Sequence, residues 1–129
     1  MSTDETGYGE LISRNIVAAR YRAGKLKQSS VAARMQALGH KWHPQTVGEV
    51  ENARRRVTVD EILCLALTLE TSVAALMEPT SDDRTIALPS GRRILGASVQ
   101  ASVRHVNDGR IKWDGDVPRF GEPDFRGEN

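Results

Sequence analysis

Two short segments of helical character, separated by a turn, occupy residues 27–56. The first segment, residues 28–38, has apolar residues spaced by four and three positions, which places them on one face of a helix: Val31, Met35 and Leu38. Gly39 follows them, and glycine commonly ends helices because it enters the left-handed conformation without a Cβ penalty. A helix this short needs another element to cover its apolar face.

The second segment, residues 43–52, has the signals of a second helix. Pro44 suits a first helical turn, where its missing N–H would have no partner in any case. Val47 and Val50 are spaced to face inward, with Trp42 just upstream. Polar or small residues occupy the other faces: Gln45, Thr46, Gly48, Glu49 and Asn52. The segment is therefore expected to dock by one face and to leave a polar face uncovered.

Three more helices are expected within residues 9–78. The first runs from Gly9 to about Arg22 and has inward apolar positions at Leu11, Ile12, Ile16 and Ala19. Thr58 and Glu61 have the spacing of a capping box in front of the apolar run 62–69. A last short helix ends at Met77, before Pro79.

The residues of the two central segments resemble a known family. The matching residues are Gln28, Val31, Ala32, Trp42, Gln45, Thr46, Val47, Val50, Glu51 and Asn52. Their pattern is similar to that of the lambda-repressor-like (xenobiotic-response-element type) helix-turn-helix transcriptional regulators, which read Gln-x-x-Leu-Ala, a turn, then Thr-(Ile/Val)-x-x-(Ile/Leu)-Glu-x-Gly. Residues 65–69 and 73–77 resemble the last two helices of that fold, so the similarity covers about residues 9–78. The chain departs from the pattern at Ala53, where the family usually has glycine, and in the extra turn residues 38–41.

The resemblance implies a mainly α fold, with a five-helix DNA-binding domain whose second central helix enters the major groove of double-stranded DNA. Glutamine can form two hydrogen bonds to adenine, threonine offers a methyl and a hydroxyl, and glutamate can accept from the cytosine amine. The residues expected to read bases are Gln45, Thr46 and Glu49. An alternative for Glu49 is an ion pair with a nearby arginine.

The family also implies contacts to the DNA backbone. The residues expected to make them are Arg20, Arg22, Lys27, Gln28, Ser29, His43, Asn52, Arg54, Arg55 and Arg56. Arg20 and Arg22 have an alternative explanation, because basic residues at a helix C-terminus interact favourably with the helix dipole. His43 also suits the N-cap position of its helix. Glu51 resembles the family's structural glutamate, which is buried and ion-paired.

The charges of the chain are strongly segregated. Residues 10–56 hold ten basic and three acidic residues, a net of +7, whereas residues 57–83 hold six acidic residues and no Lys or Arg. The net charge of the whole chain is only +1. Because a polyanion responds to the local field, the basic segment favours a nucleic-acid partner.

The two ends of the chain have a different character. Residues 1–8 are expected to be a disordered N-terminus, and the polar residues 79–84 a linker. Residues 85–114 predict a small α+β extension with a hairpin over 85–95, a helix over 97–104 and a strand over 110–113. This extension is expected either to pack on the helical domain or to pair with a second copy as a dimerisation element. Residues 115–129 are rich in Pro, Gly and charge and are expected to be loose.

The sequence indicates a binding protein and not an enzyme. Its three histidines and single cysteine lack the spacing of a zinc site, and neither a GxxxxGK loop nor a GxSxG elbow occurs. No cofactor, metal or small-molecule ligand is therefore expected. Lone Cys64 cannot form an internal disulfide, and no apolar run approaches the roughly 20 residues that span a bilayer. These features predict a cytoplasmic, nucleoid-associated protein without membrane contact.

These expectations combine into a sequence-specific double-stranded DNA-binding transcriptional regulator, a repressor that acts as a homodimer on an inverted-repeat operator. The alternative is a protein-interaction module that uses the same helical fold against a transcription or toxin partner, such as a sigma factor. The +7 segment distinguishes the two, because a protein-binding version would not need its arginines.

Overall fold

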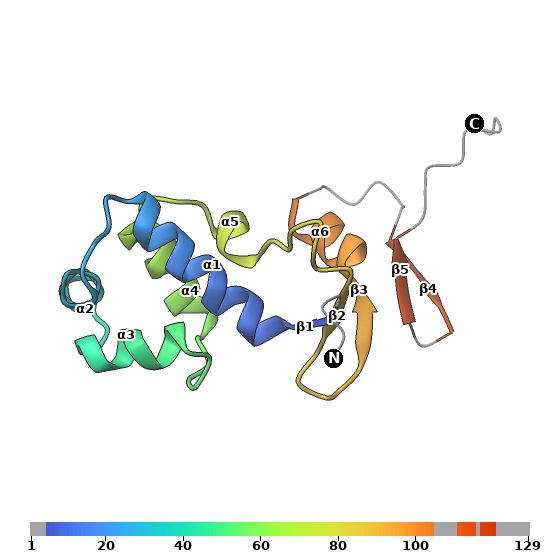
Figure 1. Cartoon of the computed structure of the whole chain (residues 1–129), viewed down its shortest axis with the longest axis horizontal. Helices are drawn as coiled ribbons and strands as arrows, with labels where there is room; N and C mark the ends of the chain where they lie inside the picture. The colour runs from blue at the N-terminus through green and yellow to red at the C-terminus, as the bar shows by residue number, and fades with distance from the viewer. Residues whose placement is uncertain (1–4, 105–110, 116, 121–129) are drawn as a thin grey trace. The chain divides into compact units, whose positions relative to one another are not determined.

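The computed structural model describes residues 5–104, 111–115 and 117–120 (Figure 1). It is mainly helical and contains a small three-stranded sheet. The chain divides into two compact units. Gly9–Met77 forms one, which we call the helical unit, and the described residues before Gly9 and after Met77 form the other, which we call the sheet unit. None of the described helices is both long and apolar enough to cross a membrane.

The helical unit contains five helices (Figure 1). They are α1 (Tyr8–Arg22, whose first residue precedes the unit), α2 (Gln28–Ala37), α3 (Pro44–Glu51), α4 (Val59–Thr68) and α5 (Val73–Met77). All five agree with the sequence prediction to within one or two residues at each end. Thr58 caps α4 as expected, because its hydroxyl accepts the N–H of Glu61 at 3.2 Å and the Glu61 carboxylate accepts the N–H of Thr58 at 2.8 Å.

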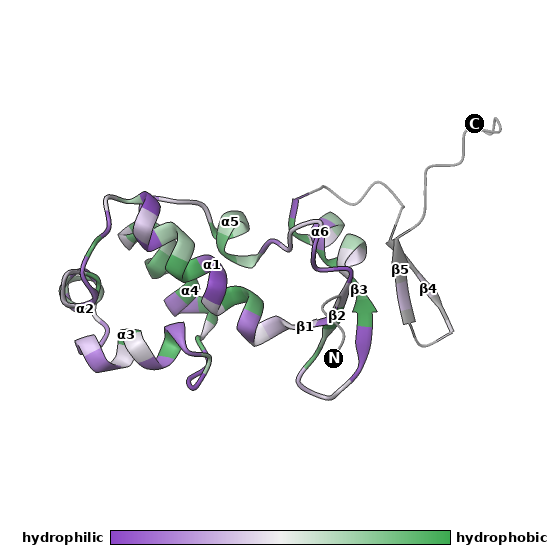
Figure 2. Cartoon of the chain, viewed as in Figure 1, coloured by the Kyte–Doolittle hydropathy of each residue, from purple (hydrophilic) through white to green (hydrophobic). Residues whose placement is uncertain are grey.

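One apolar core joins the five helices. Each contributes fully buried residues, and the largest of them is Trp42, just ahead of α3. The principal members are Ile16, Val31, Met35, Trp42, Val47, Val50, Leu65, Leu69 and Leu76. Trp42 is therefore a core residue, although it precedes the helix. Helix α4 carries an unbroken apolar run, residues 62–67, after an acidic first turn, and Figure 2 shows the two parts in green and purple.

Three of these helices end in the same hydrogen-bond pattern. After α2, α3 and α4 the chain turns through a left-handed residue, and two backbone N–H groups bond back to the last turn of the helix. At α2 the left-handed residue is Gly39, with φ of 99°, which confirms the predicted stop. At α3 it is Ala53, with φ of 58°, and at α4 it is Glu70, with φ of 56°. Ala53 therefore adopts a left-handed backbone conformation, which glycine adopts at a lower steric cost.

We expect Ala53→Gly to raise the free energy of unfolding by roughly 0.5–1 kcal/mol, because it removes the steric cost of a left-handed alanine. Urea unfolding followed by the fluorescence of Trp42 measures this change. Ala33→Gly is the matched control, since Ala33 is exposed in the interior of α2. It should lower the free energy by about 1 kcal/mol. Equal losses in both variants would contradict the assignment of strain to Ala53.

The sheet unit is built from both ends of the chain. Strands β1 (Glu5–Gly7), β2 (Thr85–Ala87) and β3 (Arg93–Leu95) lie in the order β1-β2-β3. β1 runs parallel to β2 with Thr6 opposite Ile86, and β2 runs antiparallel to β3 as the predicted hairpin. Helix α6 (Gly96–Arg104) follows, and β4 (Ile111–Asp114) pairs with β5 (Val117–Phe120).

Two expectations for the chain ends were wrong over the described residues. Residues 5–7 are not disordered but form β1, because β2 offers them a strand edge. Residues 117–120 are not loose but form β5 against β4. Residues 1–4, 116 and 121–129 of these two predicted segments lie outside the described residues. Tyr8 is the first residue of α1, and Gly115 follows β4.

The segment predicted as a linker is instead fixed within the sheet unit. Asp83 is buried, and its carboxylate accepts hydrogen bonds from the Thr6 hydroxyl at 2.7 Å and from the Thr80 N–H at 2.8 Å. Gly96 lies against the same turn, since a Cβ on it would be 1.8 Å from the Asp83 carbonyl oxygen. The first residue of α6 must therefore be glycine.

Candidate nucleic-acid interface

Helix α3 is held by one face and uncovered on the other. Val47 and Val50 are buried in the core, and the Ser13 hydroxyl of α1 donates to the Val50 carbonyl at 2.6 Å. The opposite face carries Gln45 and Asn52, which are exposed, with half-buried Gly48 and Glu49 between them. These four positions fall on one side of the helix at its 3.6-residue period. α3 therefore presents a polar ridge to solvent.

The start of α3 is fixed by local bonds. His43 occupies the N-cap position, as predicted, and Pro44 the first helical position. The Thr46 hydroxyl accepts the His43 N–H at 3.1 Å, and Thr46 is half-buried. Of the residues predicted to read bases, Thr46 therefore uses its hydroxyl to stabilise the start of α3. Gln45, in contrast, is exposed. The methyl group of Thr46 takes no part in this bond.

A buried ion pair braces α1, α2 and α3. Arg20 of α1 donates from Nε and Nη2 to the Glu51 carboxylate at 2.6 and 2.9 Å, and from Nη1 to the Leu26 carbonyl at 2.8 Å. Gln28 donates from Nε2 to the same carboxylate at 3.0 Å. The side chains of Arg20 and Glu51 are only 14% and 7% exposed. The hydrogen bond with Glu51 raises the pKa of Arg20 against the opposing effect of burial.

This brace decides the role of several predicted residues. Glu51 is the buried, ion-paired glutamate that the resemblance implied. All three guanidinium nitrogens of Arg20 donate hydrogen bonds inside the helical unit. Arg20 therefore supports α3, although the sequence placed it among the DNA-backbone contacts. Gln28 braces α3 by its amide, which lies 3.8 Å from where a Cβ on Gly48 would be. Its position beside α3 also allows the contact to the DNA backbone that the sequence predicted.

A second network fixes the loop between α3 and α4. Arg55 donates to the Glu61 carboxylate at 2.8 and 3.2 Å, and its guanidinium lies 5.2 Å from the centroid of the Trp42 ring. Trp42 donates from Nε1 to Glu61 at 3.0 Å. The hydrogen bond with Glu61 raises the pKa of Arg55, and the charge of Glu49 adds to that effect. Arg55 therefore lies within an internal network, although the sequence placed it among the DNA-backbone contacts.

Glu61 is the acidic centre of this network. Burial alone would raise its pKa, but hydrogen bonds from Arg55, the Thr58 N–H and Trp42 outweigh burial and lower the pKa to about 2. The usual value is 4.5, so the carboxylate is held ionised in the folded protein.

A pH-dependent stability follows from this shift. Because the folded pKa is depressed, Glu61 contributes stability that is complete above pH 4.5 and is lost as the pH falls towards 2. A difference of this size is worth on the order of 3 kcal/mol. Urea unfolding of the wild type and of Glu61→Gln between pH 7 and pH 3 measures it. The gap between the two proteins should narrow as the pH falls, and a constant gap would contradict the assignment.

Four exposed cations of the helical unit are candidates for contacts to phosphates. Arg22 ends α1, Lys27 precedes α2, and Arg54 and Arg56 follow α3; all four are exposed. Within the described parts of the chain, none of these four takes part in an ion pair. Ser29 is exposed in the first turn of α2, and the Asn52 side chain bonds back to the Gly48 carbonyl at 2.9 Å.

Two residues of this surface were missing from the sequence-based site. Gly48 is half-buried between Gln45 and Asn52, and a Cβ on it would lie 3.8 Å from the Gln28 amide of α2. Lys41 is exposed just ahead of Trp42. The signal for Gly48 was visible, since a glycine within a helix costs about 1 kcal/mol relative to alanine. Lys41 had no individual signal in the sequence beyond its share of the net charge of residues 10–56.

Comparisons with protein-family models, curated proteins and solved structures found no match. In the part of the chain that the structure describes, no group of three or more His, Cys, Asp or Glu side chains is placed to hold a metal ion. The candidate interface is therefore characterised by its own geometry: a polar helix face, a rigid support beneath it and exposed, unpaired cations at Lys27, Arg54 and Arg56.

Proposed function

We propose that the chain is a sequence-specific double-stranded DNA-binding transcriptional regulator with a lambda-repressor-like helix-turn-helix. The observation that carries this proposal is the uncovered polar face of α3, which is buried on its other side and bordered by exposed, unpaired cations. A helix of this kind fits the major groove, where base edges present donors and acceptors.

In this proposal α3 reads the bases. Gln45 forms the bidentate contact to adenine, and the methyl group of Thr46 contacts thymine. Glu49 accepts from a cytosine amine, with Arg55 nearby to offset repulsion from the phosphates. Gly48 has no side chain, which leaves room beside α3 for the amide of Gln28.

Phosphates are held beside α3. Lys27 and Ser29 lie at the N-terminus of α2, where free N–H groups and the helix dipole also favour an anion. Arg54 and Arg56 follow the C-terminal end of α3, the end that Gln28 of α2 also contacts through Glu51. His43 and Asn52 extend these two sets, whereas Arg22 lies beside Glu70 and Thr71, after α4. The internal pairs of Arg20 and Arg55 keep the supporting helices rigid, so less conformational entropy is lost on binding.

The regulator is proposed to act as a homodimer. Two copies of α3 about one duplex turn apart, roughly 34 Å, would match an inverted repeat. Occupation of a promoter by such a dimer blocks transcription, so we propose a repressor. The location that fits this role is the cytoplasm, at the nucleoid.

Selection from a library of random-sequence duplexes across a salt series tests the proposal. We expect retention at physiological salt and enrichment of one inverted-repeat sequence. Binding that disappears near physiological salt with nothing enriched would overturn it and favour the alternative, a protein-interaction module directed at a transcription or toxin partner.

One substitution isolates the phosphate contacts. Arg54→Ala should weaken binding to all duplexes alike and reduce the slope of log affinity against log salt by about 0.9, the value for one phosphate contact. Arg84→Ala is the matched control, because it removes the same charge from an exposed position in the sheet unit. Fluorescence anisotropy at four or more salt concentrations gives both slopes. Equal changes in the two variants would remove Arg54 from the interface.

A further inference from the structure

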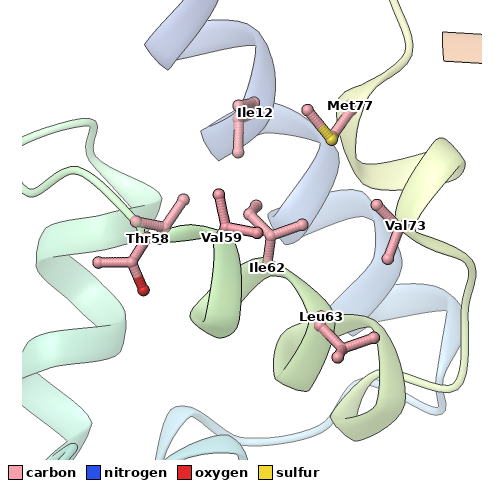
Figure 3. Close-up of a pocket in the computed structure, with 8 residues that line it drawn as sticks. Ile12, Thr58, Val59, Ile62, Leu63, Val73 and Met77 are labelled. Carbon is pink, nitrogen blue, oxygen red and sulfur yellow. The ribbon is translucent and has the colours of Figure 1, made fainter.

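Two exposed features of the helical unit take no part in the proposed contacts. One is an apolar hollow of about 260 Å³ beside the first half of α4, where Figure 3 shows Ile12 of α1 and Met77 of α5. Thr58 is the one polar residue among the described residues that line it, so the hollow offers no charge to an anion. The other feature is Tyr21, near the C-terminal end of α1, which is 54% exposed. Its hydroxyl is a group that can donate to a phosphate oxygen.

The position of Tyr21 follows from its contact with Arg20. The guanidinium carbon of Arg20 lies 5.2 Å from the centroid of the Tyr21 ring, within the range of a cation–π interaction. The same guanidinium donates to the Leu26 carbonyl and to the Glu51 carboxylate. The Tyr21 ring therefore lies close to the place where the loop before α2 meets the last residue of α3.

This place belongs to the candidate interface. Leu26 directly precedes Lys27, which is exposed and is one of the cations proposed to hold phosphates. Gln28 follows Lys27 and donates to the same Glu51 carboxylate at 3.0 Å. A half-exposed side chain beside these residues is in position to meet the stretch of DNA backbone that Lys27 would hold. Tyr21 meets that condition.

We infer that Tyr21 is a further contact to the DNA backbone, with its hydroxyl donating to a phosphate close to the one held by Lys27. This contact rests on the proposed function, because a phosphate of double-stranded DNA is its partner. The ring gives up little conformational freedom on binding, since tyrosine has only two side-chain torsions and the contact with Arg20 already restricts them. The contact carries no sequence information, because every base pair has the same phosphates.

Tyr21→Phe tests this contact, because it removes the hydroxyl and keeps the ring against Arg20. Fluorescence anisotropy should show binding to the selected and the scrambled duplex weakened alike, on the order of tenfold. The slope of log affinity against log salt should stay that of the wild type, since a neutral hydroxyl releases no counterion. Tyr8→Phe is the matched control, because it removes the hydroxyl of the other tyrosine of the chain, at the start of α1. It should change neither the affinities nor the slope.

Tyr21→Leu separates the contact to DNA from the support that the ring gives to Arg20. Urea unfolding should show a lower midpoint for Tyr21→Leu and an unchanged midpoint for Tyr21→Phe, which keeps the cation–π contact. Affinities of Tyr21→Phe within about twofold of a wild type that binds DNA would overturn the inference alone. A lower midpoint or a changed salt slope in Tyr21→Phe would overturn it too, because the hydroxyl would then act through the fold or through a charged neighbour. A wild type that binds no duplex overturns the proposed function and this contact together.

Discussion

Glu51→Gln should lower the free energy of unfolding of the helical unit by about 3 kcal/mol. The variant keeps the shape of the side chain but leaves the guanidinium of Arg20 without a charged partner, and that guanidinium is only 14% exposed. A charge in such a place needs compensation, because it has lost most of its water. Gln28 cannot replace the lost carboxylate, since its amide nitrogen donates to Glu51 as well.

The measurement is urea unfolding followed by the fluorescence of Trp42, in a Trp113→Phe background that removes the exposed second tryptophan. Glu49→Gln is the matched control, because it removes the same charge two residues earlier on α3, where no hydrogen bond among the described residues depends on the side chain. It should change stability by less than about 0.5 kcal/mol. Similar losses of stability in both variants would mean that removal of a negative charge causes the effect, and not the loss of the Arg20–Glu51 ion pair. Arg20→Met with Glu51→Met should recover part of the loss, since no buried charge remains.

A paired substitution on α3, Gln45→Ala with Thr46→Ser, should remove most of the preference among DNA sequences and leave only the contact proposed for Glu49. Each good base contact is worth about 1–3 kcal/mol of discrimination, so the ratio of affinities for the selected site and a scrambled site should fall on the order of 100-fold. Serine at position 46 keeps the hydroxyl that accepts the His43 N–H but removes the methyl group. The start of α3 is thereby preserved while the base contacts of Gln45 and Thr46 are lost.

The two affinities are measured by anisotropy at one salt concentration with the selected and scrambled duplexes. Binding to the scrambled duplex should stay within about twofold of wild type, because the phosphate contacts remain. Gln100→Ala, at an exposed position of α6, provides the control for removal of a surface glutamine. Selectivity that survives in the paired variant would place the reading element somewhere other than α3.

The helices of this chain were predictable because their signals are local. Apolar spacing, Gly39 and the Thr58–Glu61 box each act within a few residues, and the helix ends follow them closely. Strand β1 had no such signal. It has three residues, and its partner β2 lies about 80 positions along the chain, so no periodicity could reveal it.

The candidate site was predictable in part for the same reason. The spacing on α3 identified its outward residues, and the charge segregation identified the basic side of the unit. The ion pairs of Arg20 and Arg55 could not be predicted from spacing, because they depend on which carboxylate the fold brings close to each guanidinium. The motif predicted a buried pair for Glu51 but did not name its partner.

The pairing of β1 with β2 has a consequence for the order of events during synthesis. The helical unit, Gly9–Met77, is contiguous, so we expect it to fold as soon as it has left the ribosome. The three-stranded sheet cannot form until Leu95 has emerged, and Thr6 must wait unpaired while about 80 residues are added before Ile86 reaches it. A nascent chain stalled after Met77 should therefore contain a folded helical unit with a free first strand.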